Sequence, residues 1–174
     1  YPITASNGQQ VRVRYLTPDD GDLLVNLVLR LSPETRYQRF HVSMEDVPME
    51  EILRRLPPFL YVDGVDSVAL IALVDESKGE RAIGGARWRR RPGAGEAGGA
   101  VGVRGDGRRH RIGAALMGQV IEAARSLGIT RFTAMIQAGN RAVHAMIKMM
   151  GIRYDSRIDH GEDYIVMYLE EPAP

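Results

Sequence analysis

The chain contains no cysteine among its 174 residues, which excludes disulfide bonds and thiolate chemistry. No apolar run approaches the ~18 residues that a membrane-spanning helix needs. The longest run, LLVNLVLRL, is interrupted by Asn26 and Arg30. The sequence also shows no secretion signal. Together these absences favour a cytoplasmic protein.

The chain has almost no lysine, and arginine supplies nearly all of its positive charge. The formal net charge is only +1, but the charge is unevenly spread. The segment Arg81–Arg111 holds nine arginines against Glu96 and Asp106, which gives it a charge of +7. Guanidinium groups suit the geometry of phosphate, so this segment favours an anionic ligand. A solvated basic surface would explain the same count.

Composition and hydrophobic periodicity predict one α/β domain that spans residues 1–174 and has a mixed sheet. Thr17 is placed as the N-cap of the first helix, with Pro18 at its first position. The predicted strands cover residues 9–16, 66–76, 81–91, 96–104, 131–138, 152–158 and 163–169. The predicted helices cover residues 17–31, 32–40, 48–56, 112–127 and 140–151, and the third is closed by Pro57 and Pro58.

The stretch RGDGRRHRIGAAL, residues 104–116, joins a glycine-rich strand to a helix of small residues. A helix N-terminus offers free backbone N–H groups and roughly half a positive charge. Gly113 and Ala114 let a ligand approach the backbone, while Arg108, Arg109 and Arg111 add full charges. The stretch therefore predicts a phosphate or pyrophosphate site. A plain basic helix start is the alternative.

This stretch resembles the acetyl-CoA loop of the GNAT superfamily of N-acetyltransferases, whose pattern is Gln/Arg-x-x-Gly-x-Gly/Ala. Residues 108–113 fill the pattern, except that Arg111 stands where the first glycine is expected. The segments LSPETRYQRFH and YVDGVDSVALIALVDE resemble the acetyltransferase domain of bacterial protein-lysine acetyltransferases. VRVRYLTPDD resembles the family's first strand and helix start. NRAVHAMIKMMGI resembles its helix from asparagine to Gly-Phe, with Ile152 replacing the phenylalanine.

The resemblance implies an α/β fold with a mixed, mostly antiparallel central sheet of about seven strands flanked by helices. It also implies an enzyme that moves an acetyl group from acetyl-CoA to a primary amine by direct attack on the thioester. The acceptor would be either a protein lysine or a small-molecule amine. We expect no membrane or nucleic-acid partner, and a homodimer is left open.

The resemblance also implies which residues bind the donor. Main-chain groups at Val101 and Val103 would contact the pantetheine arm and the acetyl carbonyl. Arg111 would either crowd the pyrophosphate or clamp it. The cofactor-binding residues that we expect are Val101, Val103, Arg108, Arg109, His110, Arg111, Ile112, Gly113, Ala114 and Asn140.

A proton acceptor is valuable because a lysine-type amine, with a pKa near 10.4, is almost fully protonated at pH 7. Glu96 is the only carboxylate in the strand that leads to the loop. The glutamate of the related protein-lysine acetyltransferases would align at Gly98, on the same face of a regular strand. Glu96 is therefore the candidate base, reaching the site through water. A solvated turn residue beside the PGAG loop is the alternative.

The usual general acid is also missing, because the tyrosine that many family members use would align near Ile147. Tyr154 and Tyr164 are the candidate replacements, against the alternative that they pack in the core. His144, on an apolar helix, is expected to be a packed core residue. No metal-ligand spacing links the four histidines, so we expect no metal site.

Two other functions stay open. The departures at Gly98, Arg111 and Ile147 fit a catalytically degenerate acyl-CoA-binding or regulatory module. The Arg81–Arg111 segment would fit a nucleic-acid-binding module, with Trp88 stacking on a base. We rank the nucleic-acid interpretation lower for two reasons. The organisation of the family already explains half of the charge of this segment. A half-buried tryptophan on a strand also fits the sequence around Trp88 better than a stacking residue does.

Overall fold

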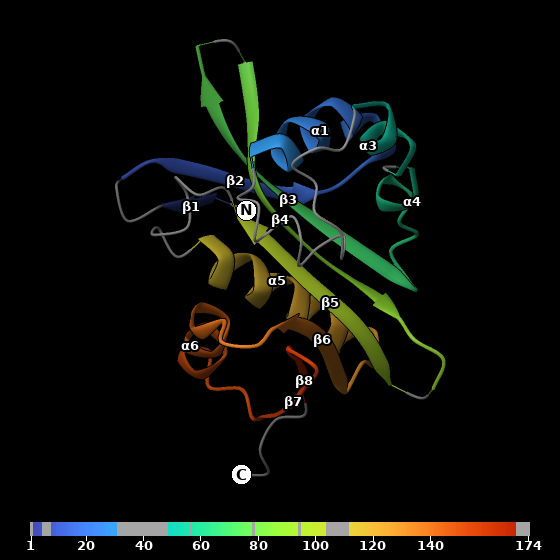
Figure 1. Cartoon of the computed structure of the whole chain (residues 1–174). Coiled ribbons are helices and arrows are strands. Elements are labelled where there is room, and N and C mark those ends of the chain that lie inside the picture. Colours follow the sequence, from blue (N-terminus) through green and yellow to red (C-terminus); the bar gives the residue numbers. More distant parts are fainter. Residues whose placement is uncertain are drawn as a thin grey trace.

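The computed structural model describes residues 2–4, 8–30, 49–55, 57–77, 79–93, 95–103 and 112–169. Within these ranges one sheet has the strand order β1-β2-β3-β4-β5-β6-β8-β7 (Figure 1). All neighbouring strands are antiparallel except β5 and β6, which run parallel. The strands are β1 (Pro2–Thr4), β2 (Gln10–Tyr15), β3 (Ser67–Glu76), β4 (Gly79–Arg90), β5 (Glu96–Val103), β6 (Arg131–Gln137), β7 (Tyr154–Asp159) and β8 (Glu162–Tyr168).

Helices cover both faces of this sheet. One face carries the short 3-10 turn Pro18–Asp20, α1 (Gly21–Arg30), α3 (Met49–Arg55) and α4 (Pro57–Leu60). The other face carries α5 (Ile112–Ser126) and α6 (Arg141–Met149). None of the helices in the described part of the chain has the length and apolar character that crossing a membrane would take.

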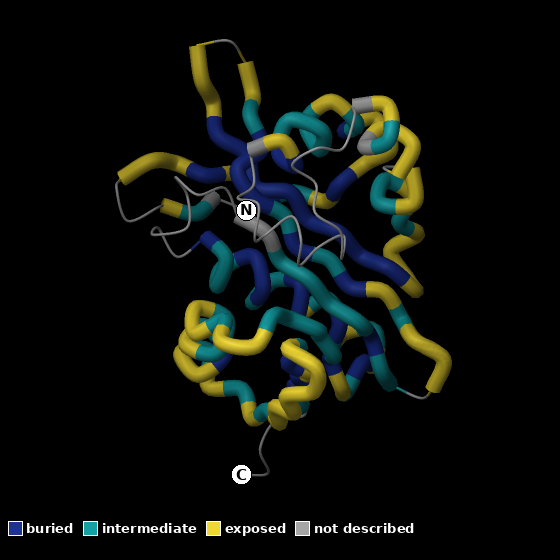
Figure 2. Tube along the Cα trace, viewed as in Figure 1, coloured by how far each residue is buried: buried dark blue, intermediate teal, exposed yellow. Residues whose placement is uncertain are grey.

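β3 supplies both hydrophobic cores, because successive residues of a strand point to opposite faces. Leu70 and Ala72 belong to the larger core, which α5 and α6 cover. Ile71 and Leu73 belong to the smaller core beneath α1. Figure 2 shows β3 buried along most of its length, whereas β5 is mainly half-buried. The continuous apolar run in the sequence is therefore the signature of a strand enclosed on both sides.

Asp20 ties the first helix to the sheet, although its side chain is only 6% exposed. Its carboxylate accepts two hydrogen bonds from the Arg14 guanidinium, at 2.7 and 2.8 Å, and one from the Thr17 backbone N–H, at 2.7 Å. The hydrogen bonds from Arg14, foremost, lower the pKa of Asp20 below its ordinary value of 3.8. The ionised carboxylate thus fixes where the chain turns from β2 into α1.

The structure confirms the α/β class and the mostly antiparallel sheet, with two differences from the sequence predictions. The sheet has eight strands rather than about seven, because β1 pairs with β2 over only three residues and is too short to show a periodicity. Pro57 ends α3 but also begins α4, since proline is tolerated in a first helical turn. The helix predicted at 32–40 lies outside the described residues.

Trp88 is fully buried rather than half-buried, with 0% of its surface exposed, and packs in the larger core. A ring in this position cannot stack on a nucleic-acid base. The structure therefore removes Trp88 as a stacking residue from the nucleic-acid alternative, which then rests on the Arg81–Arg111 segment alone.

Candidate active site

β5 and β6 pair at their first residues and then separate. Only three pairs join them, and the last is Gly98 opposite Thr133. β5 nevertheless stays paired with β4 as far as Val103, and β6 with β8 as far as Gln137. Residues 99–103 and 134–137 therefore border a gap in the sheet, which we call the β5–β6 opening. Unpaired strand edges present backbone donors and acceptors to a ligand.

A glycine and an aromatic ring mark the point where the strands part. Phe132 is fully buried, and its ring lies against Gly99 so closely that a Cβ on that residue would overlap the ring. Any residue other than glycine would force the ring or the strand to move. The Gly99–Phe132 contact thus accounts for the glycine in the middle of β5.

α5 follows β5 in the chain and contacts it. Ile112, its first residue, is 1% exposed and anchors the helix in the larger core, while Gly113 and Ala114 are half-buried. A helix of 15 residues directs its free N–H groups and positive dipole end at whatever lies before Ile112. The predicted loop residues Arg108, Arg109, His110 and Arg111 lie outside the described residues.

Val101 and Val103 both lie beyond Gly98, on the part of β5 that borders the opening. The side chain of Val101 is half-buried and packs against the larger core. The backbone of Val101 borders the opening, and the contact of Val101 and Val103 with a pantetheine arm stays a prediction. Asn140 is the N-cap of α6, as predicted, and its Oδ1 accepts a hydrogen bond of 3.3 Å from the backbone N–H of Val143. Its contact with a cofactor stays a prediction.

Glu96 is the first residue of β5, at the paired end of the strand. Its carboxylate oxygen Oε2 lies 3.9 Å from the place of a Cβ on Gly93, so the side chain leans toward the β4–β5 turn. Three residues, or roughly 10 Å along the strand, separate Glu96 from the start of the opening. Any proton transfer from an amine there to Glu96 has to pass through water.

The two candidate acids lie on opposite faces of the sheet. Tyr154 packs against the larger core, and its Oη lies 2.9 Å from Nδ1 of His144. Tyr164 is 39% exposed on the other face, with its hydroxyl 3.4 Å from Glu162 and its ring under the Arg157 guanidinium. Both lie in the β7–β8 hairpin, on the far side of β6 from the opening. Their role as acids stays a prediction.

His144 is not simply packed in the core, as the sequence suggested, but connects α6 to the hairpin. Its Nε2 lies 2.7 Å from Oδ2 of Asp163, a carboxylate that is only 1% exposed. Ser156 donates its hydroxyl hydrogen to the other oxygen of that carboxylate. With Tyr154 on Nδ1, the four side chains form one hydrogen-bonded group, and all of them but Tyr154 line a pocket of about 400 Å³.

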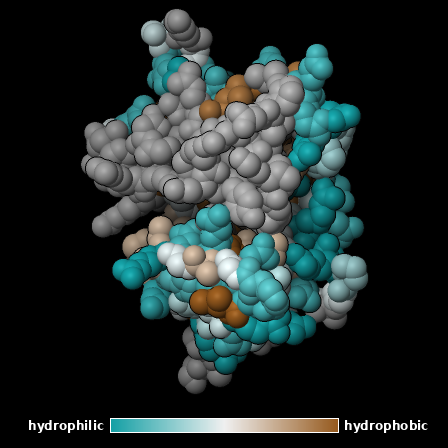
Figure 3. Space-filling view, in the orientation of Figure 1, coloured by the Kyte–Doolittle hydropathy of each residue, from teal (hydrophilic) through white to brown (hydrophobic). Residues whose placement is uncertain are grey.

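One signal in the sequence could have revealed this group. Strand alternation puts Asp163 on the same face as Ile165 and Met167, which are buried. A carboxylate on a core face requires a partner. The partner, His144, lies on another element and cannot be identified from the strand. In Figure 3 the surface over α6 and the β7–β8 hairpin is mainly hydrophilic.

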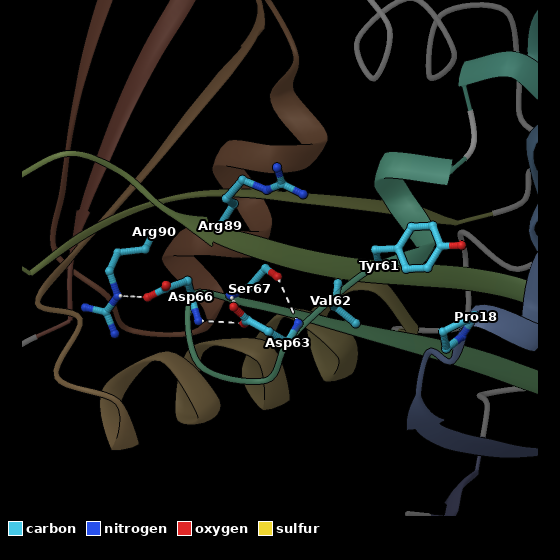
Figure 4. Close-up of a pocket in the computed structure, with 8 residues that line it drawn as sticks. All are labelled: Pro18, Tyr61, Val62, Asp63, Asp66, Ser67, Arg89 and Arg90. Atoms are coloured by element: carbon cyan, nitrogen blue, oxygen red, sulfur yellow. Dashed lines mark hydrogen bonds and ion pairs between the residues drawn. The ribbon is translucent and has the colours of Figure 1, made fainter.

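A second pocket, of about 560 Å³, lies where β3 begins and β4 ends (Figure 4). The Oδ1 atom of Asp63 accepts hydrogen bonds from the backbone N–H groups of Val65, Asp66 and Ser67. These bonds, that of Val65 foremost, lower the pKa of Asp63 below 3.8. Because this carboxylate shapes the turn, it is poorly suited to accept protons. No cluster of three metal-ligating side chains occurs among the residues that the structure describes.

Comparison with known families decides the identity of the fold. The model of the acetyltransferase (GNAT) family matches residues 28–152, which is most of the chain. The chain belongs to the GNAT acetyltransferase family. It is an acetyltransferase, and this family uses acetyl-CoA as the acetyl donor.

Individual relatives agree with this assignment. An acetyltransferase of Pseudomonas aeruginosa is 28% identical over 145 residues, which cover 83% of this chain and 76% of that protein. The GNAT domain of the protein acetyltransferase PAT from S. lividans matches with a TM-score of 0.78 at 25% identity, covering 95% of this chain and 94% of that one. The PaiA N-acetyltransferase of Thermoplasma acidophilum, solved in complex with coenzyme A, has the same fold. Its TM-score is 0.63 at 16% identity, over 91% of this chain and 98% of that one.

Replacing His144 with alanine should destabilise the protein, because the Asp163 carboxylate would lose its cationic or N–H partner while remaining buried. Removing one partner of a buried pair costs about 3 kcal/mol or more. Equilibrium unfolding in urea would measure the loss of free energy.

The double variant His144→Ala/Asp163→Asn is the matched control. It should recover part of the loss, because the amide leaves no unpaired charge behind. A loss below about 0.5 kcal/mol for His144→Ala, typical of a surface substitution, would show that the group does not hold α6 to the hairpin.

Proposed function

We propose that the chain acetylates a primary amine in the β5–β6 opening, by direct attack of the amine on the thioester of acetyl-CoA. The observation that carries the proposal is the separation of β5 from β6 after Gly98 and Thr133. It leaves residues 99–103 of β5 without pairs to β6, so backbone groups of that edge are left to bind a ligand. The acceptor is a protein lysine or a small-molecule amine, and we place the enzyme in the cytoplasm as a monomer or homodimer.

The donor is bound from the α5 and α6 face of the sheet. Free N–H groups and the dipole at the start of α5 attract the pyrophosphate, and Gly113 and Ala114 leave space for it. Arg108, Arg109 and His110 would add charge-assisted hydrogen bonds to the phosphates, and Arg111 would either clamp the pyrophosphate or crowd it. The backbone at Val101 and Val103 aligns the pantetheine arm along the β5 edge.

Acetyl-CoA supplies an acyl group already activated as a thioester. The chain's own contribution is to position the two reactants and to stabilise the charge that develops on them. A backbone N–H of the β5 edge that points at the acetyl oxygen would stabilise negative charge as it develops there. The amine gives up a proton through water to Glu96, the only carboxylate on β5. The sulfur that leaves receives a proton from Tyr154 or Tyr164 by way of water.

Acetyl-CoA should stabilise the fold, since the native state alone forms the site. At a ligand concentration 100-fold above Kd the gain is about 2.7 kcal/mol. A thermal melt with and without acetyl-CoA measures the binding, and release of CoA thiol with a panel of amines and lysine peptides measures the reaction.

The two measurements together distinguish an enzyme from a module that only binds acyl-CoA. A raised melting temperature without thiol release for any acceptor would identify an acyl-CoA-binding module that does not catalyse. An unchanged melting temperature at millimolar acetyl-CoA would contradict the donor site itself.

Replacing Glu96 with glutamine keeps the size of the side chain but removes its ability to accept a proton. We expect turnover at saturating acetyl-CoA to fall by about 10²-fold, at the lower end of what a general base contributes, because the route runs through water. The acidic limb of the pH–rate profile should flatten, while the affinity for acetyl-CoA should stay the same.

Glu122→Gln is the matched control, because the Glu122 side chain is 69% exposed on α5 and forms an ion pair with Arg125 of the same helix. It should leave turnover unchanged. If Glu96→Gln retains the full rate and the same pH profile, Glu96 is a turn residue and the proton leaves to solvent instead.

A further inference from the structure

Arg91 occupies the place where the family resemblance puts a glutamate side chain. A Cβ on Gly98 would lie 2.9 Å from Nε and 3.1 Å from Nη2 of Arg91. The guanidinium therefore lies directly on the backbone of Gly98. The backbone N–H of Arg91 donates a 2.9 Å hydrogen bond to the carbonyl of Glu96, which fixes the start of the side chain. A cation thus takes the position of a carboxylate.

This cation has no acidic partner in the part of the chain that the structure describes. Arg91 is exposed and takes part in none of the ion pairs found there. The nearest carboxylate in the sequence, Glu96, leans toward Gly93 in the turn. Arg89, on the same face of β4, is directed elsewhere, with Nη2 3.2 Å from the carbonyl of Pro58.

The position of Arg91 in the sheet points to the acceptor rather than the donor. Gly98 forms the last pair before the β5–β6 opening. Its neighbour Ala97 packs into the core beneath α5, so residue 98 faces the opposite side, where α1 lies. A donor held at the start of α5 enters from the α5 face. The amine must therefore approach from the side on which Arg91 lies.

We propose that Arg91 binds a carboxylate that the acceptor carries close to its amine, an inference that rests on the proposed function. A guanidinium pairs with a carboxylate through two parallel hydrogen bonds. Its charge also lowers the pKa of a nearby amine, which increases the neutral, nucleophilic fraction. The substrate class is thus an amino carboxylate: a free amino acid, or a peptide lysine with an acidic neighbour.

The test compares acceptors that differ only in that carboxylate. With the full chain and saturating acetyl-CoA, thiol release is measured for lysine against lysinamide, and for a peptide containing Asp-Lys against one containing Asn-Lys. We expect kcat/KM to favour the carboxylate about 10- to 100-fold, the worth of a charge-assisted pair. Whichever of the two comparisons shows the preference identifies whether the carboxylate belongs to a free amino acid or to a peptide.

Arg91→Gln should reduce that preference to about 1, mainly through KM for the carboxylate acceptor, and Arg91→Lys should retain part of it. Arg12→Gln is the matched control, because Arg12 lies on β2, near the far edge of the sheet, paired with Asp75 and Glu80. It should keep the full preference.

Gly98→Ala gives a second test that leaves every charge in place. The added Cβ must displace the Arg91 guanidinium, a flexible group that can move, so the preference should again fall. Equal rates for acids and amides in the unmodified protein, or a preference that survives both Arg91→Gln and Gly98→Ala, would overturn the inference. Absence of thiol release with every acceptor would instead contradict the proposed function.

Discussion

The contact between Phe132 and Gly99 is the constraint on which the site depends. The buried ring lies against the α5 face of Gly99, one residue past the last pair that joins the two parallel strands. Since each strand remains paired on its other side, the sheet stays intact while a gap opens inside it. A sheet normally satisfies its backbone groups internally, and under the proposed function this internal gap would offer them to the donor.

β3 is enclosed between two cores, so helices cover both faces of the sheet. Each face can therefore serve a different substrate. The α5 face provides a helix N-terminus, which favours phosphate. The α1 face provides Arg91 over Gly98, which favours a carboxylate near the amine. Donor and acceptor would thus meet in the gap from opposite sides, each drawn by positive charge. Other arginines of the 81–111 segment have structural partners instead, since Arg81 pairs with Glu76 and Arg90 with Asp66.

Local patterns were enough to predict most of the fold. The alternation around Val11 and the spacing of apolar residues in Ile112–Ser126 are each encoded within one element, and both elements form as expected. The group around His144 was not predicted, because it joins residues of three elements through side-chain geometry. The placement of Arg91 on Gly98 was also missed, since it depends on how the β4–β5 turn folds back. Strand registers and long-range side-chain contacts leave no periodic pattern in the local sequence, so they could not be predicted from it.

Amide hydrogen exchange on β5 tests the central claim most directly. Within residues 99–103, the amides that do not pair with β4 should exchange rapidly in the free protein and slowly with acetyl-CoA bound. The amides of Ala97 and Gly98, already in the paired end of the strand, should change no more than those of β3. Protection that appears elsewhere, with residues 99–103 unaffected by acetyl-CoA, would contradict the assignment of the β5–β6 opening as the active site.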